Sequence, residues 1–186
     1  MVKIVSETTE QELIDRIRDV ALLKNPDIRP YRCAEVAIRE VNLADIKPTT
    51  LYVLSKNLEF QRNLTATLAG HDLDPLSLSG VAELEHQGNV TGLIPPIVEV
   101  DAEHGPCLID GAHRTYIGRQ AGRSIISALW IEGVDPNYPI YAYPNDWVDI
   151  VEYDSIPAVK KHYREGDYSR LYRDISALNG SAMRAI

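Results

Sequence analysis

Residues 106–122, PCLIDGAHRTYIGRQAG, decide how the rest of the chain is interpreted. The short apolar run CLI is typical of a buried strand. Asp110 and Gly111 end this strand, because aspartate predicts a helix N-cap and glycine allows a sharp turn or a close approach of the backbone to a ligand. Residues 112–120 then have the apolar spacing of a helix, and Gly122 predicts its end.

This strand–glycine–helix junction predicts an anion site. Such a junction directs free backbone N–H groups and the positive end of the helix dipole toward one point. His113 and Arg114 lie in the first helical turn and add hydrogen-bond donors and positive charge. Cations in a first turn oppose the dipole, so their placement is easier to explain if a phosphate or carboxylate lies between them. The alternative is that His113 and Arg114 are simply solvated and that the junction binds no anion.

The composition is that of an ordinary globular protein. The chain has 186 residues, of which 45% are hydrophobic and 25% charged, and this length fits one domain. It lacks the run of roughly 20 apolar residues that a membrane span requires, and its N-terminus lacks the organisation of a signal peptide. Cys33 and Cys107 have no metal-ligand spacing, so we expect both to be reduced and buried in a cytoplasmic protein.

Charge is distributed unevenly along the chain. The net charge of −8 argues against tight, non-specific binding to nucleic acid. The segment from residue 157 onward is nevertheless basic, with Lys160, Lys161, Arg164, Arg170, Arg173 and Arg184. We expect a C-terminal helix whose basic face contacts either an acidic patch of its own domain, the interpretation we favour, or phosphates such as those of DNA.

The remaining patterns predict an α+β fold. They indicate helices over residues 9–24, 57–69 and 77–87, strands over 32–43, 51–54, 93–100 and 124–131, and helices from residue 156 onward. Pro95-Pro96 would restrict the third of these strands to an exposed start. This organisation divides the chain into an N-terminal helical extension (1–30), a core (31–150) in which 71–93 is an insertion, and C-terminal helices (151–186).

The turn Asp110-Gly111-Ala112-His113-Arg114 resembles the signature of the ParB/sulfiredoxin superfamily. In that superfamily a strand ends in a Gly-x-x-Arg or Gly-x-His-Arg turn that opens a helix and holds nucleotide phosphates. The turn most resembles the Asp-Gly-His-His-Arg of the free-serine kinases, and it is similar also to the Gly-Cys-His-Arg of sulfiredoxins and the Gly-Glu-Arg-Arg of ParB nucleotidases. The order of strands, turn and helix over residues 33–134 is similar as well. The resemblance implies a single-domain nucleotide-binding member with a small mixed sheet and packed helices.

The resemblance also implies a nucleotide site and its chemistry. The residues that would bind the terminal phosphates of ATP or ADP, with Mg²⁺, are Gly111, Ala112, His113, Arg114 and Thr115. Arg114 would neutralise charge on the transferred phosphoryl group, and His113 would donate to a phosphate oxygen. Asp110 would orient a hydroxyl or water, or help to hold Mg²⁺. These roles describe an ATP- or ADP-dependent phosphotransferase or an ATPase with an unknown acceptor. The structural alternatives are an N-cap for Asp110 and a helix-start hydrogen bond for His113.

Departures from the known families narrow this expectation. Sulfiredoxins need a cysteine where this chain has Ala112, and the serine kinases have a catalytic glutamate near the position of Thr49-Thr50. Glu40, Asp45 and Glu59 are nearby candidates for that carboxylate. Too few residues follow the core for the helix-turn-helix domain of segregation proteins. Two alternatives stay open: a ParB-like nuclease or DNA-associated plasmid or phage factor of the fertility-inhibition type, and a non-catalytic nucleotide-sensing interaction module.

Two further groups of residues invite a functional interpretation. The aromatic side chains that follow the last core strand can form the wall of a base pocket: Tyr138, Tyr141, Tyr143 and Trp147. The alternatives are a segment that wraps the core as a lid or one that makes a homodimer contact. The acids and histidines of residues 71–93 match no tight ligand set, so we predict no metal site formed by protein side chains alone.

Overall fold

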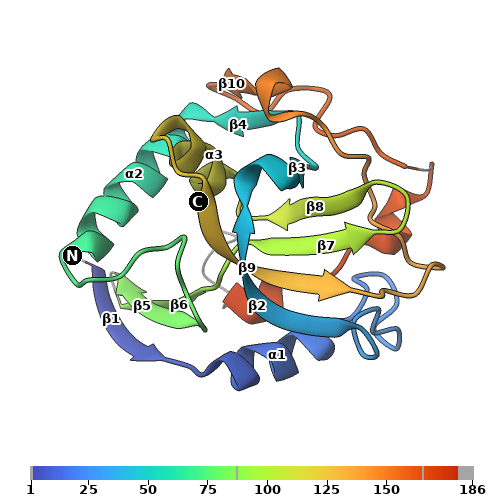
Figure 1. The fold of residues 1–186 in the computed structure, drawn as a ribbon, viewed down its shortest axis with the longest axis horizontal. Coiled ribbons are helices and arrows are strands. Elements are labelled where there is room, and N and C mark those ends of the chain that lie inside the picture. The colour runs from blue at the N-terminus through green and yellow to red at the C-terminus, as the bar shows by residue number, and fades with distance from the viewer. Residues whose placement is uncertain (1, 87, 165, 180–186) are drawn as a thin grey trace.

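The computed structural model describes residues 2–86, 88–164 and 166–179, and it has the α+β class that the sequence predicts (Figure 1). Its strands are β1 (Val2–Glu7), β2 (Glu35–Asn42), β3 (Lys47–Pro48), β4 (Tyr52–Leu54), β5 (Ala82–His86), β6 (Asn89–Leu93), β7 (Ile97–Asp101), β8 (Gly105–Asp110), β9 (Ile125–Glu132) and β10 (Val151–Tyr153). Its α-helices are α1 (Glu10–Arg18), α2 (Ser55–Ala69), α3 (Ala112–Gln120) and α4 (Ser176–Asn179), and 3₁₀ turns cover Leu43–Asp45, Trp147–Asp149 and Tyr168–Leu171.

A five-stranded mixed sheet in the order β2-β9-β7-β8-β3 forms the core. Its central strand, β7, runs parallel to β9 and antiparallel to β8. Because successive side chains of a strand point to opposite faces, Ile97 and Leu129 pack in the cluster that includes α1, whereas Val98 and Ala128 pack on the other face with Leu108. Both faces of β7 are therefore covered, which explains its nearly continuous apolar sequence.

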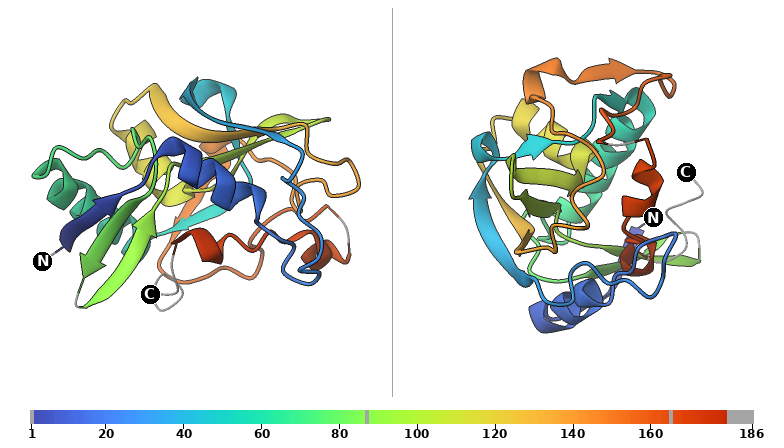
Figure 2. Two further views of the ribbon diagram at one scale, coloured as in Figure 1. Left: turned by 90° about the horizontal axis from the view of Figure 1, so that it is seen from below. Right: turned by 90° about the vertical axis from the view of Figure 1, so that its right-hand side faces the viewer.

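Helix α1 covers one face of this sheet and is shorter than predicted. It begins with a capping box at Thr9 but ends at Arg18, not at residue 24. Val20 and Leu22 are buried all the same, because the turn that follows the helix brings them inward. Figure 2 shows α1 and β10 at opposite ends of the molecule.

The prediction of a helix over residues 77–87 is wrong. Residues 82–86 form β5, which lies between β1 and β6 in a separate three-stranded sheet. Ala82 and Leu84 are buried and pack against Leu64 and Leu68 of α2. The segment therefore follows a period of two rather than the helical period, since burying alternate side chains is what a half-buried strand requires.

Two other expectations are corrected in the core. Pro95 and Pro96 are buried, not exposed, because they lead directly into the central strand, where the Pro96 carbonyl accepts from Leu129 N–H at 2.8 Å. Cys33 is exposed, whereas Cys107 is buried as predicted, and both are free.

The C-terminal part is mostly irregular, so the prediction of helices from residue 156 onward is wrong except for the short helix α4. The described residues between β10 and the last 3₁₀ turn form no helix and no strand. Their aromatic side chains pack on one another instead, with the rings of Tyr163 and Tyr168 stacked at 3.6 Å. Arg164 pairs with Asp101 at 2.7 Å and Arg173 with Glu99 at 2.7 Å, which confirms the expected contact with acids of the same chain. Arg184 lies outside the described residues.

In the described part of the chain, none of the helices combines the length and the apolar character that crossing a membrane requires.

Candidate functional site

The junction between β8 and α3 has the predicted bounds, but its cap differs from the prediction. Asp110 is the last residue of β8, and Gly111 occupies the N-cap position with φ +87° and no side-chain cap bond. The expectation that Asp110 caps the helix is therefore wrong. The first intrahelical bond runs from Thr115 N–H to the Gly111 carbonyl at 3.0 Å. The three N–H groups that precede Thr115 in the helix thus have no acceptor within it.

A cavity of about 230 Å³ opens at this junction. All the predicted site residues except Thr115 line it. Thr115 is fully buried in the helix, and its N–H is already bonded to Gly111. Ile109 of β8 lines the cavity as well, and the other lining residues come from parts of the chain distant in the sequence: Thr50, Gln61, Gly92, Leu93, Ile94 and Lys161. The sequence-predicted turn therefore forms one wall of a site that the fold completes.

Arg114 is the most unusual residue of this cavity. Its side chain is only 6% exposed, and among the described residues its Nε and Nη1 atoms have no hydrogen-bond partner. Its Nη2 lies 3.9 Å from Asp110 Oδ2, which is too long for a hydrogen bond. Burial lowers the pKa of the Arg114 guanidinium. A buried cation with unused donors is costly, and an anion bound in the cavity would offset that cost.

Glycine is required at the turn because the Arg114 side chain folds back over it. A Cβ at Gly111 would lie 3.0 Å from Arg114 Nε and 3.1 Å from the Pro96 Cα. The positive φ is a second reason, since residues with a side chain adopt it at a cost of roughly 1–2 kcal/mol.

We expect Gly111→Ala to lower the free energy of unfolding by about 1–2 kcal/mol and to weaken anion binding by displacing Arg114. Gly122→Ala is the matched control, because Gly122 has φ +80° and a Cβ there would meet nothing within 4 Å. Urea denaturation and calorimetric titration with ADP would measure both effects. Equal loss of ADP affinity in the two variants would contradict this role of Gly111.

His113 connects α3 to the start of α2. Its Nε2 accepts a hydrogen bond from Leu54 N–H at 3.2 Å, and Leu54 is the N-cap residue of α2. Burial lowers the pKa of the His113 imidazole, consistent with a neutral ring that accepts through this nitrogen. The predicted helix-start hydrogen bond is thus present, made to a neighbouring helix. A phosphate contact from His113 stays a prediction and would use Nδ1.

The carboxylates and aromatic residues suggested by the sequence lie elsewhere. Among the described residues that line the cavity, Asp110 is the one carboxylate, and Glu40, Asp45 and Glu59 are not among them. None of the four aromatic candidates lines it either. Trp147 donates from Nε1 to the Ile46 carbonyl at 2.7 Å. The segment around Tyr141 and Tyr143 pairs with the C-terminal segment instead, where Tyr143 N–H donates to the His162 carbonyl at 2.7 Å.

Lys161 is the charged cavity residue that sequence reasoning missed. Its Nζ donates to the Thr49 carbonyl and to Thr49 Oγ1, each at 3.2 Å. The only sequence signal was its place in the basic C-terminal segment, where we assigned it to a helix face. The irregular path of that segment, fixed by tertiary contacts, brings it to the junction.

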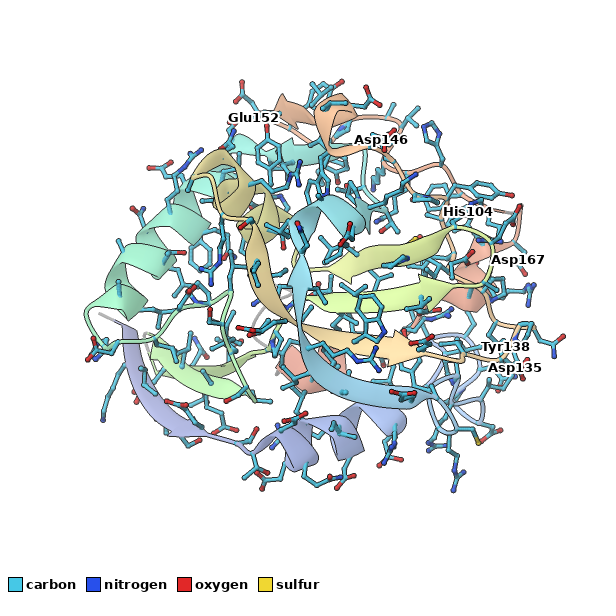
Figure 3. All side chains as sticks on the ribbon, in the orientation of Figure 1. His104, Asp135, Tyr138, Asp146, Glu152 and Asp167 are labelled. Carbon is cyan, nitrogen blue, oxygen red and sulfur yellow. The ribbon has the colours of Figure 1, made fainter. Side chains whose placement is uncertain are left out.

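In the described part of the chain, one group of side chains has its possible ligand atoms close enough together to bind a metal ion. The group consists of Asp101, Glu103 and His104. The Asp101 carboxylate is occupied, because it accepts from the N–H groups of Glu103 and His104 and pairs with Arg164. Figure 3 shows His104 at the turn between β7 and β8, at the other end of β8 from the cavity. These contacts give the group a structural role in the turn.

The fold and the site together define a ParB-like α+β protein whose strand–glycine–helix turn carries a buried arginine. The family model described as ParB CE domain matches residues 12–151, which is more than half of the chain. The chain therefore belongs to the ParB CE domain family. No curated protein and no solved structure matches it.

Proposed function

We propose that this protein binds ATP or ADP at the β8–α3 junction and transfers or hydrolyses the terminal phosphoryl group. The observation that supports this most directly is Arg114, a nearly buried cation with unused N–H donors beside the free N–H groups of a helix N-terminus. Both features favour a multiply charged anion. The family membership makes a nucleotide the phosphate-bearing ligand to test first.

The residues of the turn would divide the work between binding and charge neutralisation. The N–H groups of Ala112, His113 and Arg114 would fix the phosphate, and the Arg114 guanidinium would neutralise charge that builds up during transfer. Asp110 lines the cavity and would orient the attacking hydroxyl or water. Gln61 Oε1 is buried without a hydrogen-bond partner among the described residues, so it offers an acceptor to an O–H or N–H group of a bound ligand.

The residues that line the cavity can hold Mg²⁺ only if the nucleotide supplies further ligands to the ion. Such an ion takes one or two carboxylates together with phosphate oxygens and water, and Asp110 would provide the single carboxylate. Its chemical contribution would be to neutralise charge on the phosphate oxygens.

The second candidate function is nucleotide binding without turnover, in which the bound state sets a protein contact. The observation that favours it is the single carboxylate in the described lining, which leaves few groups to act as a general base. DNA binding through the basic segment has less support, because Arg164 and Arg173 are paired within the fold.

A thermal-shift screen with ATP, ADP, CTP and GTP, each with Mg²⁺, tests the proposal. A ligand at 100 times its dissociation constant stabilises the native state by about 2.7 kcal/mol, which would raise the melting temperature measurably. Release of inorganic phosphate from a ligand that binds would then separate the enzyme from the binding module. The absence of a shift with all four nucleotides would contradict nucleotide binding.

A further inference from the structure

We propose that Lys161, from the irregular C-terminal segment, is a second cationic phosphate ligand of the cavity and acts together with the α3 turn. This inference rests on the proposed function, because it assigns a ligand group to the same site. It adds a residue outside the family-matched range, which ends at residue 151.

The first observation is that the backbone holds Lys161 in place from two sides. Leu51 N–H donates to the carbonyl of Lys160, and Tyr143 N–H donates to the carbonyl of His162 at 2.7 Å. Arg164, three residues further on, bonds to Asp101 and to the Ile140 carbonyl. The segment that carries Lys161 is thus fixed to the edge of the core rather than lying loosely across it.

The second observation concerns the hydrogen bonds that the Lys161 ammonium group makes. An ammonium has three N–H donors, and Lys161 gives two of its donors to Thr49, through the carbonyl and the hydroxyl. The Nζ atom lies 5.2 Å from the centre of the Tyr141 ring. Lys161 lines the same cavity as Arg114 and Asp110. One N–H donor therefore remains for a ligand in a cavity that already contains one unsatisfied cation.

The charges around Lys161 come from three elements. Asp110 at the end of β8 and Arg114 and His113 in α3 line the cavity with it, and Tyr141 contacts it from the segment before β10. On its own segment the neighbours are Lys160, His162 and Tyr163. Asp110 is the one nearby carboxylate that raises the pKa of Lys161, and burial outweighs it, lowering that pKa to about 8. A bound polyphosphate would reverse this by favouring the charged form.

The ligand-free protein provides the first measurement. In the unfolded chain a lysine titrates near pH 10.4, so between about pH 8 and that value the unfolded state binds more protons. Stability due to this group therefore rises with pH across that window. We expect the melting temperature of the wild type, relative to Lys161→Met, to increase from about pH 8 to about pH 10. A constant difference would contradict the burial of this ammonium in the cavity, on which the inference rests.

Binding of ADP and of pyrophosphate is the second measurement, by calorimetric titration from about pH 7.5 to 9.5. Because the charged lysine makes a charge-assisted hydrogen bond to phosphate that the neutral amine does not make, wild-type affinity for ADP should fall by about tenfold per pH unit above pH 8. Lys161→Met should bind about 10- to 100-fold more weakly at pH 7.5, with no decline at higher pH. The pH dependence is assessed with ADP, because its terminal phosphate is almost fully ionised in this range, whereas pyrophosphate still loses its last proton there. The lowered pKa of His113 keeps this side chain neutral.

Lys160→Met is the matched control, because Lys160 is exposed and adjacent and contributes its backbone rather than its side chain to the fold. It should behave as the wild type does at every pH. If Lys161→Met binds ADP with wild-type affinity and pH dependence, the inference is wrong and nucleotide binding stands. If the wild type binds pyrophosphate through Lys161 but no nucleotide, the proposed function alone is wrong. If it binds neither, both are wrong.

Discussion

Replacing Arg173 with alanine is expected to lower the free energy of unfolding by about 3–5 kcal/mol, because it leaves a buried carboxylate without its partner. Arg173 and Glu99 have side-chain exposures of 3% and 2%, and their closest atoms are 2.7 Å apart. Burial raises the pKa of the Glu99 carboxyl despite the adjacent guanidinium. The Tyr31 hydroxyl also donates to Glu99, at 2.8 Å.

The same guanidinium also fixes the chain that surrounds it. It donates to the carbonyls of Tyr138, Pro139 and Leu171, so one side chain holds the segment after β9 and the C-terminal segment on the central strand. Removing it takes this donor from three carbonyls and leaves the Glu99 carboxylate with the Tyr31 hydroxyl but without a cation. Since native proteins are stable by only about 5–15 kcal/mol, this variant would lose a large part of its stability.

Urea denaturation would measure this loss of stability. Two further variants test whether it comes from the buried charge of Glu99. The double variant Glu99→Gln with Arg173→Ala should be more stable than Arg173→Ala alone, because the uncompensated charge is gone. Lys24→Ala removes an exposed ion pair with Asp167 and should change stability little. A loss of under about 1 kcal/mol for Arg173→Ala, the range of exposed pairs, would contradict a structural role for the buried pair.

The parts of the fold that could be predicted are those in which local sequence and tertiary environment agree. The bounds of α3 follow from a strand, a glycine and a helical pattern that lie next to one another in the sequence. The segment AELEH of β5 shows a different situation. It alternates as a strand does, but its neighbours also permit a helical pattern, and its pairing with the N-terminal strand β1 is a long-range contact that the sequence does not reveal.

The site was predictable on one side only. Its α3 wall came from a turn of consecutive residues, whereas Lys161 and Gln61 reach the cavity from distant elements. The aromatic spacing of Tyr163, Tyr168 and Tyr172 resembles that of a helix, yet these rings pack on one another and on Tyr141. Tertiary packing thus overrides the local period in the segment that carries the missed lysine.

Replacing Arg114 with methionine should separate function from stability. The change removes a nearly buried cation whose nearest carboxylate is 3.9 Å away and keeps a flexible apolar side chain in the same volume. Substituting apolar groups for buried charges is often neutral or stabilises by about 1–4 kcal/mol. We therefore expect the ligand-free variant to melt at the same temperature as the wild type or higher, while losing the ADP-induced shift.

Turnover should respond more strongly than stability, because a cation that neutralises a transferred phosphoryl group contributes about 10³-fold or more to its rate. Phosphate release from ATP measures this, and Arg119→Met is the matched control in the same helix. Arg119 donates to the Leu43 carbonyl and lies over the Trp147 ring, outside the cavity lining. Its variant should retain nucleotide binding and turnover. Unchanged turnover in Arg114→Met would exclude the proposed phosphoryl-transfer role, and a large loss of stability would show that Arg114 supports the fold rather than an anion.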